Sequence, residues 1–481
     1  MIKKVLKQIY KTAKQENVQV YAVGGYVRDI LLKNKNKKDI DFVVIGSGLD
    51  FAKKLDIAFK QEGTLIEFPD FDTARYVFTE EIAPGQKKKL LEIEFAGARS
   101  EKYEKNSRKP QVIKTNLEED LARRDFTINA LAREVSFFGL KKKIIDKYDG
   151  QNDLQKKILR TPLNPDETFS EDPLRMMRAA RFASQLNFNI EKETFEAIKR
   201  NCKRLKIISA ERIQEEFLKL LSTPKPSIGL WILFETGLFA EFMPEIIELE
   251  GVEEVYGHNH KNNLEHSFKV VDNVALFSDK VFLRLAALLH DIGKPGTKKY
   301  DKKRAWTFDM HEHLGKKISR DICKRLKISK NDTEYILKLV RFHQQPIALM
   351  DEGVTDSPIR RLIVNLGDDL QDLLILCRSD ITTGNQTKLA KRLKNYDLLE
   401  KRIAEVLEKD KLRAFQSPLR GEEIMELLNI RPCPLIGKIK KEIEEAILDG
   451  KIANEYEESK KYFFAIKNNY LAEIEKYKNQ S

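Results

Sequence analysis

The chain has little cysteine and no long apolar run, and both absences narrow the class of protein. Four cysteines are scattered among its 481 residues without a Cys-x-x-Cys pair, so neither a zinc knuckle nor a disulfide framework is indicated. No apolar run approaches the ~20 residues that span a membrane. Residues 1–17 alternate charged and apolar residues as an amphipathic helix does, and they lack the apolar core of a signal peptide. We therefore expect a cytoplasmic protein with no membrane partner.

Charged residues are abundant, and positive charge is in excess. The 87 lysines and arginines outnumber the 75 aspartates and glutamates, which gives a formal net charge of +12. The basic excess favours a polyanionic partner, and it favours nucleic acid over a membrane because no single basic amphipathic helix stands out. The alternative is a lysine-rich chain whose charge serves only solubility.

Two aspartates begin an apolar segment at residues 40–45. Asp39 and Asp41 alternate with apolar residues, and side chains two positions apart on a strand point to the same face. Two carboxylates this close repel each other unless a cation lies between them. Mg²⁺ is the expected cation, since it binds carboxylate oxygens together with substrate phosphates. An exposed strand end that binds no metal is the simpler interpretation of this motif alone.

A glycine pair and an arginine precede these aspartates. Gly24 and Gly25 allow the backbone to turn sharply and approach a ligand, and their N–H groups can bind phosphate. Arg28 follows at the distance of a phosphate clamp. In this order the glycines, the arginine and the carboxylates predict a nucleoside triphosphate site, although a glycine pair alone is usually only a turn.

The block Val-Gly-Gly-x-Val-Arg-Asp at 23–29, followed by Asp-Ile-Asp-Phe-Val-Val at 39–44, resembles a known signature. It is similar to the nucleotidyltransferase motif of the bacterial CCA-adding enzyme and poly(A) polymerase family. The resemblance implies an α+β protein, with a polymerase-β-like head containing a mixed sheet, followed by helical domains. It also implies that a tRNA 3′-hydroxyl attacks the α-phosphorus of CTP or ATP, with two Mg²⁺ ions held by Asp39 and Asp41.

A third acidic group is expected on the strand at 90–96. Glu92 and Glu94 share a strand face, and either is a candidate third metal ligand or activator of the attacking hydroxyl. Alignment to the family favours Glu92 for this catalytic role. A solvated strand face is an equally good interpretation.

The segment 117–132 resembles the family motif Arg-Arg-Asp-Phe-Thr-x-Asn-Ala. The resemblance implies that Arg124 binds the triphosphate and that Asp125 and Asn129 bind the ribose hydroxyls. Helix capping and packing are the alternative roles for these residues.

An aspartate and an arginine three residues apart form a candidate base-reading pair. Asp172, predicted as an N-cap before Pro173, shares a helix face with Arg175. Ionised aspartate only accepts hydrogen bonds and arginine only donates them, so the pair suits cytosine and adenine and rejects uracil and guanine. The family motif Glu-Asp-x-x-Arg is interpreted in the same way. Arg178 and Arg181 are expected to face phosphates or to stiffen this reader.

All seven histidines fall between His258 and His343. With two aspartates they resemble the ligand pattern of HD phosphohydrolases, and imidazole and carboxylate ligands suit Mn²⁺, Fe²⁺, Ni²⁺ or Co²⁺. His313 is the alternative to His311, and a helical domain that has lost its metal and only supports tRNA is the alternative function. The candidate ligands are His266, His290, Asp291, His311, His343 and Asp380.

We expect four domains. These are a catalytic head at 1–145, a helical neck at 146–250 that reads the base and binds tRNA, a helical HD domain at 251–400, and a helical tRNA-binding tail at 401–481. The expected function is CCA addition to tRNA from CTP and ATP without a nucleic-acid template. The alternatives are poly(A) polymerase, CC-only or A-only addition, an HD phosphohydrolase as the principal activity, and an RNA-binding protein with an inactive head.

Overall fold

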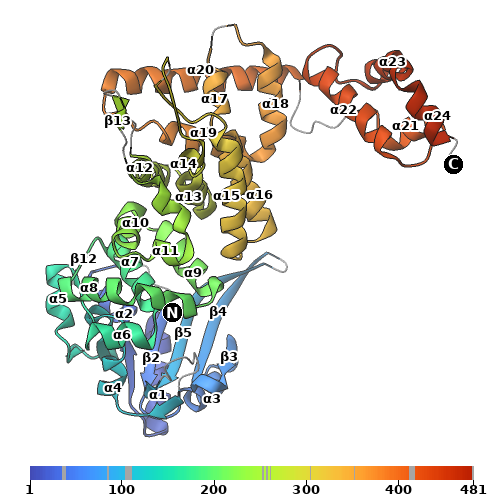
Figure 1. The fold of residues 1–481 in the computed structure, drawn as a ribbon. Helices are drawn as coiled ribbons and strands as arrows, with labels where there is room; N and C mark the ends of the chain where they lie inside the picture. The colour runs from blue at the N-terminus through green and yellow to red at the C-terminus, as the bar shows by residue number, and fades with distance from the viewer. Residues whose placement is uncertain are drawn as a thin grey trace. The chain divides into compact units, whose positions relative to one another are not determined.

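The computed structural model describes residues 1–34, 39–83, 86–102, 111–251, 254–255, 258–259, 262–303, 305–351, 353–410 and 418–478. The chain divides into two compact units (Figure 1). The first comprises Met1–Glu248 with Lys324–Lys327, and the second Leu249–Cys323 with Ile328–Ser481. Our finer division into four domains stays a prediction. Within the described ranges, no helix is both long enough and apolar enough to cross a bilayer.

The first unit begins with a mixed sheet, as predicted. Its strand order is β10-β8-β1-β2-β5-β4-β3, and β2 and β5 pair in parallel while their other partners are antiparallel. The expected strand at 90–96 is longer than predicted, because it pairs with β4 along an extended hairpin. The strands are β1 (Val20–Val23), β2 (Asp39–Val44), β3 (Thr64–Phe68), β4 (Thr73–Ala83), β5 (Gln86–Gly97), β8 (Leu131–Ser136), β9 (Gly139–Leu140) and β10 (Ile145–Asp146).

Helices pack against the sheet, and an aromatic cluster holds one of them in place. The predicted N-terminal amphipathic helix is α1 (Ile2–Gln15), which contacts β8, β1 and α3 (Gly48–Ala58). Phe51 of α3 packs 5.3 Å from the ring of Phe95 on β5, which stacks 5.1 Å from Phe42 on β2. Burying these large rings fixes the central strands, whose ends carry the candidate site.

Shorter elements complete the head. They are α2 (Gly25–Leu31), the hairpin β6 (Arg99–Lys102) with β7 (Gln111–Lys114), and α4 (Leu117–Ala122). Asn116 caps α4 by accepting a hydrogen bond from the backbone N–H of Glu119, the role that asparagine commonly has at this position.

The rest of the first unit is almost entirely helical. α7 packs against α9 and α10, and Gly229 of α10 permits this contact, since a Cβ there would lie 2.8 Å from the carbonyl oxygen of Ala180. The elements are α5 (Gly150–Lys156), β11 (Ile158–Leu159), α6 (Pro165–Glu171), α7 (Leu174–Leu186), β12 (Asn189–Ile190), α8 (Lys192–Asn201), α9 (Ala210–Leu221), α10 (Pro226–Glu235) and α11 (Phe239–Phe242).

The second unit is built from helices around α13, which contacts α12, α16 and α19. Residues 419–474 contribute a separate hydrophobic cluster that includes Leu419, Ile439 and Phe463. The α+β class with a mixed-sheet head is confirmed. The helices are α12 (Asn263–Ala275), α13 (Val281–Leu289), α14 (Lys294–Thr297), α15 (His311–Arg325), α16 (Lys330–Phe342), α17 (Gln345–Ala348), α18 (Asp356–Leu366), α19 (Leu370–Ser379), α20 (Gln386–Asp410), α21 (Gly421–Leu428), α22 (Pro434–Leu448), α23 (Tyr456–Ile466) and α24 (Leu471–Lys478).

Candidate active site

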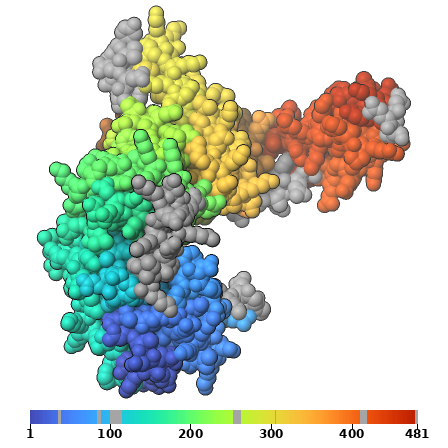
Figure 2. Space-filling view, turned by 60° about the horizontal axis from the view of Figure 1, so that its bottom comes forward, coloured from blue at the N-terminus to red at the C-terminus, as the bar shows by residue number. Residues whose placement is uncertain are grey.

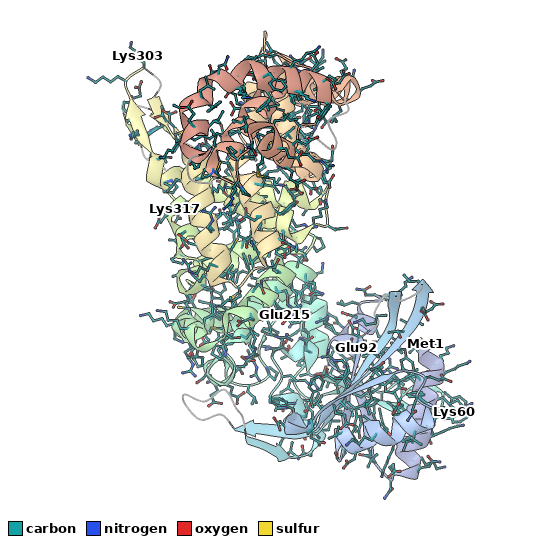
Figure 3. All side chains as sticks on the ribbon, turned by 90° about the vertical axis from the view of Figure 1, so that its right-hand side faces the viewer. Met1, Lys60, Glu92, Glu215, Lys303 and Lys317 are labelled. Atoms are coloured by element: carbon teal, nitrogen blue, oxygen red, sulfur yellow. The ribbon has the colours of Figure 1, made fainter. Side chains whose placement is uncertain are left out.

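Carboxylates gather at one end of the parallel pair β2 and β5. Asp39 lies opposite Glu92 in the register, and Asp41 lies opposite Glu94. In a parallel pair the partners in register project to the same face, so the four carboxylates form one acidic edge. Glu92 is marked on the sheet in Figure 3.

Two basic side chains bind this acidic edge. Lys89 Nζ lies 3.0 Å from carboxylate oxygens of both Asp39 and Glu92, and hydrogen bonds to Glu92 and Asp39 raise the pKa of Lys89. Arg75 lies 3.1 Å from Glu92 and 3.1 Å from Glu94. Four carboxylates therefore face two cations, and the surplus negative charge together with the oxygen donors suits a hard divalent cation.

The glycine turn brings an arginine close to these carboxylates. Gly24 has a φ of +70° and stands at the N-cap of α2. A Cβ there would lie 3.1 Å from Nη1 of Arg124 and 3.6 Å from Oδ2 of Asp41. Both polar groups thus reach the turn only because glycine has no side chain.

Arg28, expected to clamp phosphate, is instead enclosed in the head. Its side chain is 1% exposed, and it donates hydrogen bonds to Asp29 at 2.8 Å and to Asn129 Oδ1 at 2.7 Å. Its guanidinium also lies 5.1 Å from the ring centroid of Phe182. The geometry of Arg28 is that of a group that orients Asn129.

Asp125 receives the next hydrogen bonds in this chain of contacts. One carboxylate oxygen accepts from Asn129 Nδ2 and from the backbone N–H of Phe126, both at 2.9 Å. The other accepts from Nε and Nη2 of Arg178 at 2.9 and 2.7 Å. Burial alone would raise the pKa of Asp125, but the Arg178 charge and the Asn129 hydrogen bond lower it to about 2.

A cavity of about 260 Å³ opens beside Asp125. Its lining brings together predicted site residues from residues 124–125 and 172–178, and it adds Arg212 of α9. Five arginines and two aspartates make it a strongly polar, net positive cavity of the kind that binds phosphorylated ligands. It is lined by Arg123, Arg124, Asp125, Asp172, Leu174, Arg175, Arg178 and Arg212.

Asp172 and Arg175 are held firmly in this lining. Asp172 accepts a hydrogen bond from the backbone N–H of Leu174 at 3.1 Å. The N-cap itself is Pro173, one residue later than predicted, because the regular helix begins only at Leu174. Arg175 donates to the carbonyls of Thr168 at 3.1 Å and Arg123 at 2.6 Å.

Arg212 was missed from the sequence, and Arg181 lies outside the cavity. Arg212 on α9 pairs with the second carboxylate oxygen of Asp172 at 3.1 Å. One feature of the sequence could have pointed to Arg212. It lies in the first turn of a helix, where a positive charge opposes the helix dipole and is unfavourable without a partner. Arg181 pairs with Glu216 at 2.6 Å and lines a different cavity on α7 and α9.

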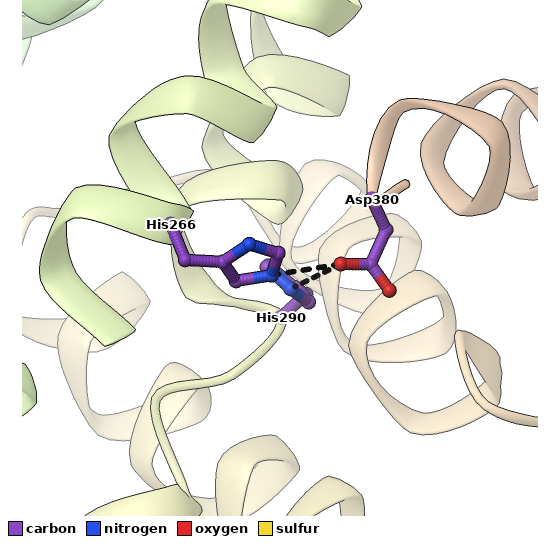
Figure 4. A group of neighbouring side chains, drawn as sticks. All are labelled: His266, His290 and Asp380. Carbon is purple, nitrogen blue, oxygen red and sulfur yellow. Dashed lines mark ion pairs between the residues drawn. The ribbon is translucent and has the colours of Figure 1, made fainter. Parts of the chain in front are cut away.

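The second unit gathers all six predicted HD residues into two adjoining triads. In the first, Oδ1 of Asp380 lies 2.8 Å from Nε2 of His266 and 3.4 Å from Nε2 of His290 (Figure 4). The second triad consists of Asp291, His311 and His343. The alternative residue His313 is 45% exposed and lies outside both triads.

In the second triad, Asp291 lies 3.4 Å from Nε2 of His311 and 3.7 Å from Nε2 of His343. The two histidine Nε2 atoms are 3.2 Å apart. The same carboxylate also reaches Nε2 of His290 in the first triad at 3.2 Å, so Asp291 lies between the two triads.

The histidine rings are oriented as metal ligands usually are. Nδ1 of His290, His311 and His343 lies 2.7–2.8 Å from a backbone carbonyl oxygen, which fixes the proton on Nδ1 and directs the Nε2 lone pair into the cluster. Nε2 of His290 and Oδ1 of Asp291 are buried without a hydrogen-bond partner. Asp291 is also paired with Lys294 through its other oxygen. The inward Nε2 atoms and the unpartnered carboxylate oxygen are donors of the kind that bind transition-metal ions, so these residues fit a metal ion.

The pKa values of two histidines in the cluster also reflect its negative charge. Burial would lower the pKa of His290, but the charges of Asp291 and Asp380 raise it to about 10. Burial and the charge of His290 lower the pKa of His343 to about 4. The cluster thus holds positive charge at one position and excludes a second proton nearby.

Comparisons with known proteins agree with this division into sites. Residues 20–160 match the poly A polymerase head domain family, residues 187–249 the family described as the probable RNA and SrmB-binding site of polymerase A, and residues 263–373 the HD domain family. Nucleotidyltransferases of this kind generally use a divalent metal ion.

Individual relatives cover most of the chain. A multifunctional CCA protein of Aliivibrio salmonicida is 35% identical over 68% of this chain and 75% of that protein. A CC-adding tRNA nucleotidyltransferase of Thermus thermophilus is 30% identical over 91% of each chain. An A-adding tRNA nucleotidyltransferase of Deinococcus radiodurans is 31% identical over 71% of this chain and 78% of that protein. The fold is similar to the crystal structure of the Bacillus stearothermophilus CCA-adding enzyme in complex with CTP, with a TM-score of 0.66 and 21% identity over 97% and 98% of the two chains.

The Asp125 carboxylate generates a prediction about pH. Its folded pKa of about 2 lies below the ordinary 3.8, so its stabilising effect is complete above about pH 4 and is lost as the pH falls toward 2, by about 2 kcal/mol in all. Asp125→Asn removes this ionisation. We expect the difference in unfolding free energy between wild type and Asp125→Asn to shrink between pH 6 and pH 3 in urea titrations. A difference that is constant over this range contradicts the assignment.

Proposed function

Since this chain belongs to the family of tRNA nucleotidyltransferases with a poly A polymerase head and an HD domain, we propose that it adds CCA to the 3′ end of tRNA. The substrates are CTP and ATP, and the leaving group is pyrophosphate. One observation carries the proposal. Arg124 lines the arginine-rich cavity and also reaches the Gly24 turn beside Asp41, so a triphosphate bound by the arginines meets the acidic edge.

The acidic edge is the proposed Mg²⁺ site, with Asp39, Asp41 and Glu92 as ligands. Their hard oxygen donors match this ion, and the bonds of Lys89 to two of them mark where positive charge is required. Bound Mg²⁺ would lower the pKa of the attacking hydroxyl and neutralise charge on the leaving pyrophosphate.

The arginines of the cavity bind the triphosphate in this proposal. Arg124 is held by Asp120 at 3.0 Å, which fixes its guanidinium while leaving donors for phosphate. Gly25, whose backbone N–H begins α2, follows the Gly24 turn that Arg124 approaches. Arg28 and Asn129 act as positioning groups, since they hold Asp125 and through it Arg178.

Asp172 and Arg175 read the base. The hydrogen bonds of Arg175 within the described residues use three of its five N–H donors, so donors remain for a ring nitrogen or carbonyl oxygen. The carboxylate of Asp172 accepts from an exocyclic amine once Arg212 moves aside or shares its oxygen. Cytosine and adenine both present this amine, which is why one site serves CTP and ATP and why we favour complete CCA addition.

The metal assignment predicts the effect of removing the two aspartates. Asp39→Ala and Asp41→Ala should each lower incorporation of labelled CTP into tRNA that lacks CCA by more than about a hundredfold. Glu80→Ala, which removes an exposed acidic residue from β4, is the matched control and should retain activity. Wild-type rates in both aspartate variants would exclude the acidic edge as the catalytic centre.

The base-reading assignment predicts a change of specificity. Asp172→Ala removes the carboxylate that repels the carbonyl of uracil and guanine, so the preference for CTP over UTP should fall at least about tenfold. The measurement is the ratio of kcat/KM for the four nucleotides. An unchanged ratio would show that another group selects the base.

The HD cluster supports a second activity, metal-dependent phosphohydrolysis. The observation that favours it is the pair of adjoining triads with a buried, unpartnered His290 Nε2 and Asp291 Oδ1. His266, His290 and Asp380 would hold one ion, and Asp291, His311 and His343 a second, of Mn²⁺, Fe²⁺, Ni²⁺ or Co²⁺. A bound ion of this kind supplies hydroxide near neutral pH.

His290→Ala should reduce bound transition metal, measured by elemental analysis, and abolish hydrolysis of bis-p-nitrophenyl phosphate. CTP incorporation into tRNA should persist, since the cluster belongs to the other unit. His313→Ala, an exposed histidine outside both triads, is the control and should keep metal and hydrolysis. Metal content equal to wild type in His290→Ala would refute the site.

A further inference from the structure

We propose that the head carries a second RNA-binding surface, which takes single-stranded RNA by stacking bases on two exposed phenylalanines and pairing phosphates with surrounding lysines. It goes beyond the proposed function, because it is separate from the cavity and the acidic edge. We name it the aromatic–lysine surface. It consists of Lys7, Lys14, Phe137, Phe138, Lys142 and Lys143.

The two phenylalanines occupy a hairpin turn where the backbone does not require them. They connect β8 to β9, and Phe138 is 94% and Phe137 41% exposed. Tight hairpin turns favour glycine, asparagine and aspartate, and the positive φ of this turn falls on Gly139. Exposed rings of this size at a turn point to a binding role rather than a packing role.

One of the rings is held in position, and the other is presented to solvent. Phe137 packs against Tyr10 at 6.1 Å, and Lys7 Nζ lies 4.5 Å from its ring centroid. Phe138 stands edge-on to Phe137, with centroids 5.2 Å apart at 86°. Phe137, which is packed against the protein, and Phe138, which is exposed to solvent, together form a surface on which a base can stack.

Lysines lie on two segments that adjoin this hairpin, α1 and residues 141–143. Lys3, Lys7, Tyr10 and Lys14 follow helical spacing and share one face of α1, and the Lys7–Phe137 contact shows that this face borders the hairpin. Figure 2 shows the start of the chain, in dark blue, at the molecular surface.

Beyond β9, the three residues 141–143 are exposed lysines. Lys141 interacts electrostatically with Tyr10 of α1, which places this segment next to the helix. Lys141 pairs with Glu134 at 2.7 Å. Within the described residues, Lys142, Lys143 and Lys14 form no ion pair, so they carry positive charge suited to phosphates.

The surface lies at the opposite end of the sheet from the acidic edge. β8 begins at Leu131, whose carbonyl accepts a hydrogen bond from the N–H of Gly24 at 3.2 Å. It then runs antiparallel to β1 and ends at Ser136, roughly 17 Å away at ~3.4 Å per residue. RNA bound to the hairpin therefore leaves the nucleotide cavity open.

The observations favour RNA over a lipid surface. An interfacial helix buries an apolar face in the membrane, but the apolar residues of α1 are already in the protein core. Val5, Leu6 and Ile9 are at most 5% exposed. What the surface offers is two rings and several cations, the combination that binds single strands.

The test uses the full chain and a fluorescein-labelled single-stranded RNA with a blocked 3′ end. Fluorescence anisotropy measures the affinity of the protein for this RNA. The double variant Phe137→Ala/Phe138→Ala should weaken binding by at least about tenfold. Phe277→Ala, which removes a 70% exposed phenylalanine in the other unit, should bind as wild type does. Equal affinity of all three proteins would overturn the proposal.

Chemical acetylation of lysines, measured by mass spectrometry with and without RNA, shows which lysines the bound RNA covers. Bound RNA should protect Lys142 and Lys143 by several-fold, and it should leave Lys60, an exposed lysine elsewhere in the head, unprotected. Lys142→Glu/Lys143→Glu should lessen the salt dependence of binding. Protection of Lys60 alone would overturn the proposal.

Two further readouts separate RNA binding at this surface from a role in folding and from membrane binding. The phenylalanine double variant should keep wild-type kcat for CTP incorporation, and a matching loss of kcat would mean that the residues act only through the fold. Sedimentation with phosphatidylglycerol vesicles that requires both phenylalanines, with no change in RNA binding, would instead identify a membrane-binding surface and refute the RNA assignment.

Discussion

Parallel pairing between β2 and β5 is the constraint on which the candidate active site depends. It places Asp39 beside Glu92 and Asp41 beside Glu94, a concentration of like charge that is stable only with cations close by. Lys89 and Arg75 provide that charge in this structure. In the proposed function, divalent ions take the place of these cations when a triphosphate binds.

A buried chain of hydrogen bonds links α2 to α7. Arg28 orients Asn129, Asn129 donates to Asp125, and Asp125 accepts from Arg178 on α7. These side chains lie in a buried region of low dielectric constant. Removing one of them would leave its partner without a hydrogen bond, which would lower the stability of the fold. Arg28, which does not line the cavity, is thereby connected to Arg178, which does.

The two units show different amounts of preorganisation. The HD ligands already meet within metal-binding distances, with Nδ1 atoms facing carbonyl oxygens and Nε2 atoms directed inward. Two of the head carboxylates are instead paired with Lys89, a salt bridge that nucleotide and metal would replace in the proposed function. A resident metal fits the first arrangement, and ions that arrive with the substrate fit the second.

Local spacing and resemblance together determined part of this protein. The Asp39–Asp41 pair could be predicted because residues two apart on one strand point to the same face. The His290–Asp291 pair was expected from the resemblance to HD phosphohydrolases, and Asp172 precedes α7 rather than sharing it with Arg175. The tertiary structure alone decided which distant groups meet: the salt bridge of Arg212 to Asp172, the salt bridge of Lys89 to Asp39, and the hydrogen bond of Arg28 to Asn129. These contacts join segments far apart in the chain, and their geometry is set by packing rather than by helical or strand period.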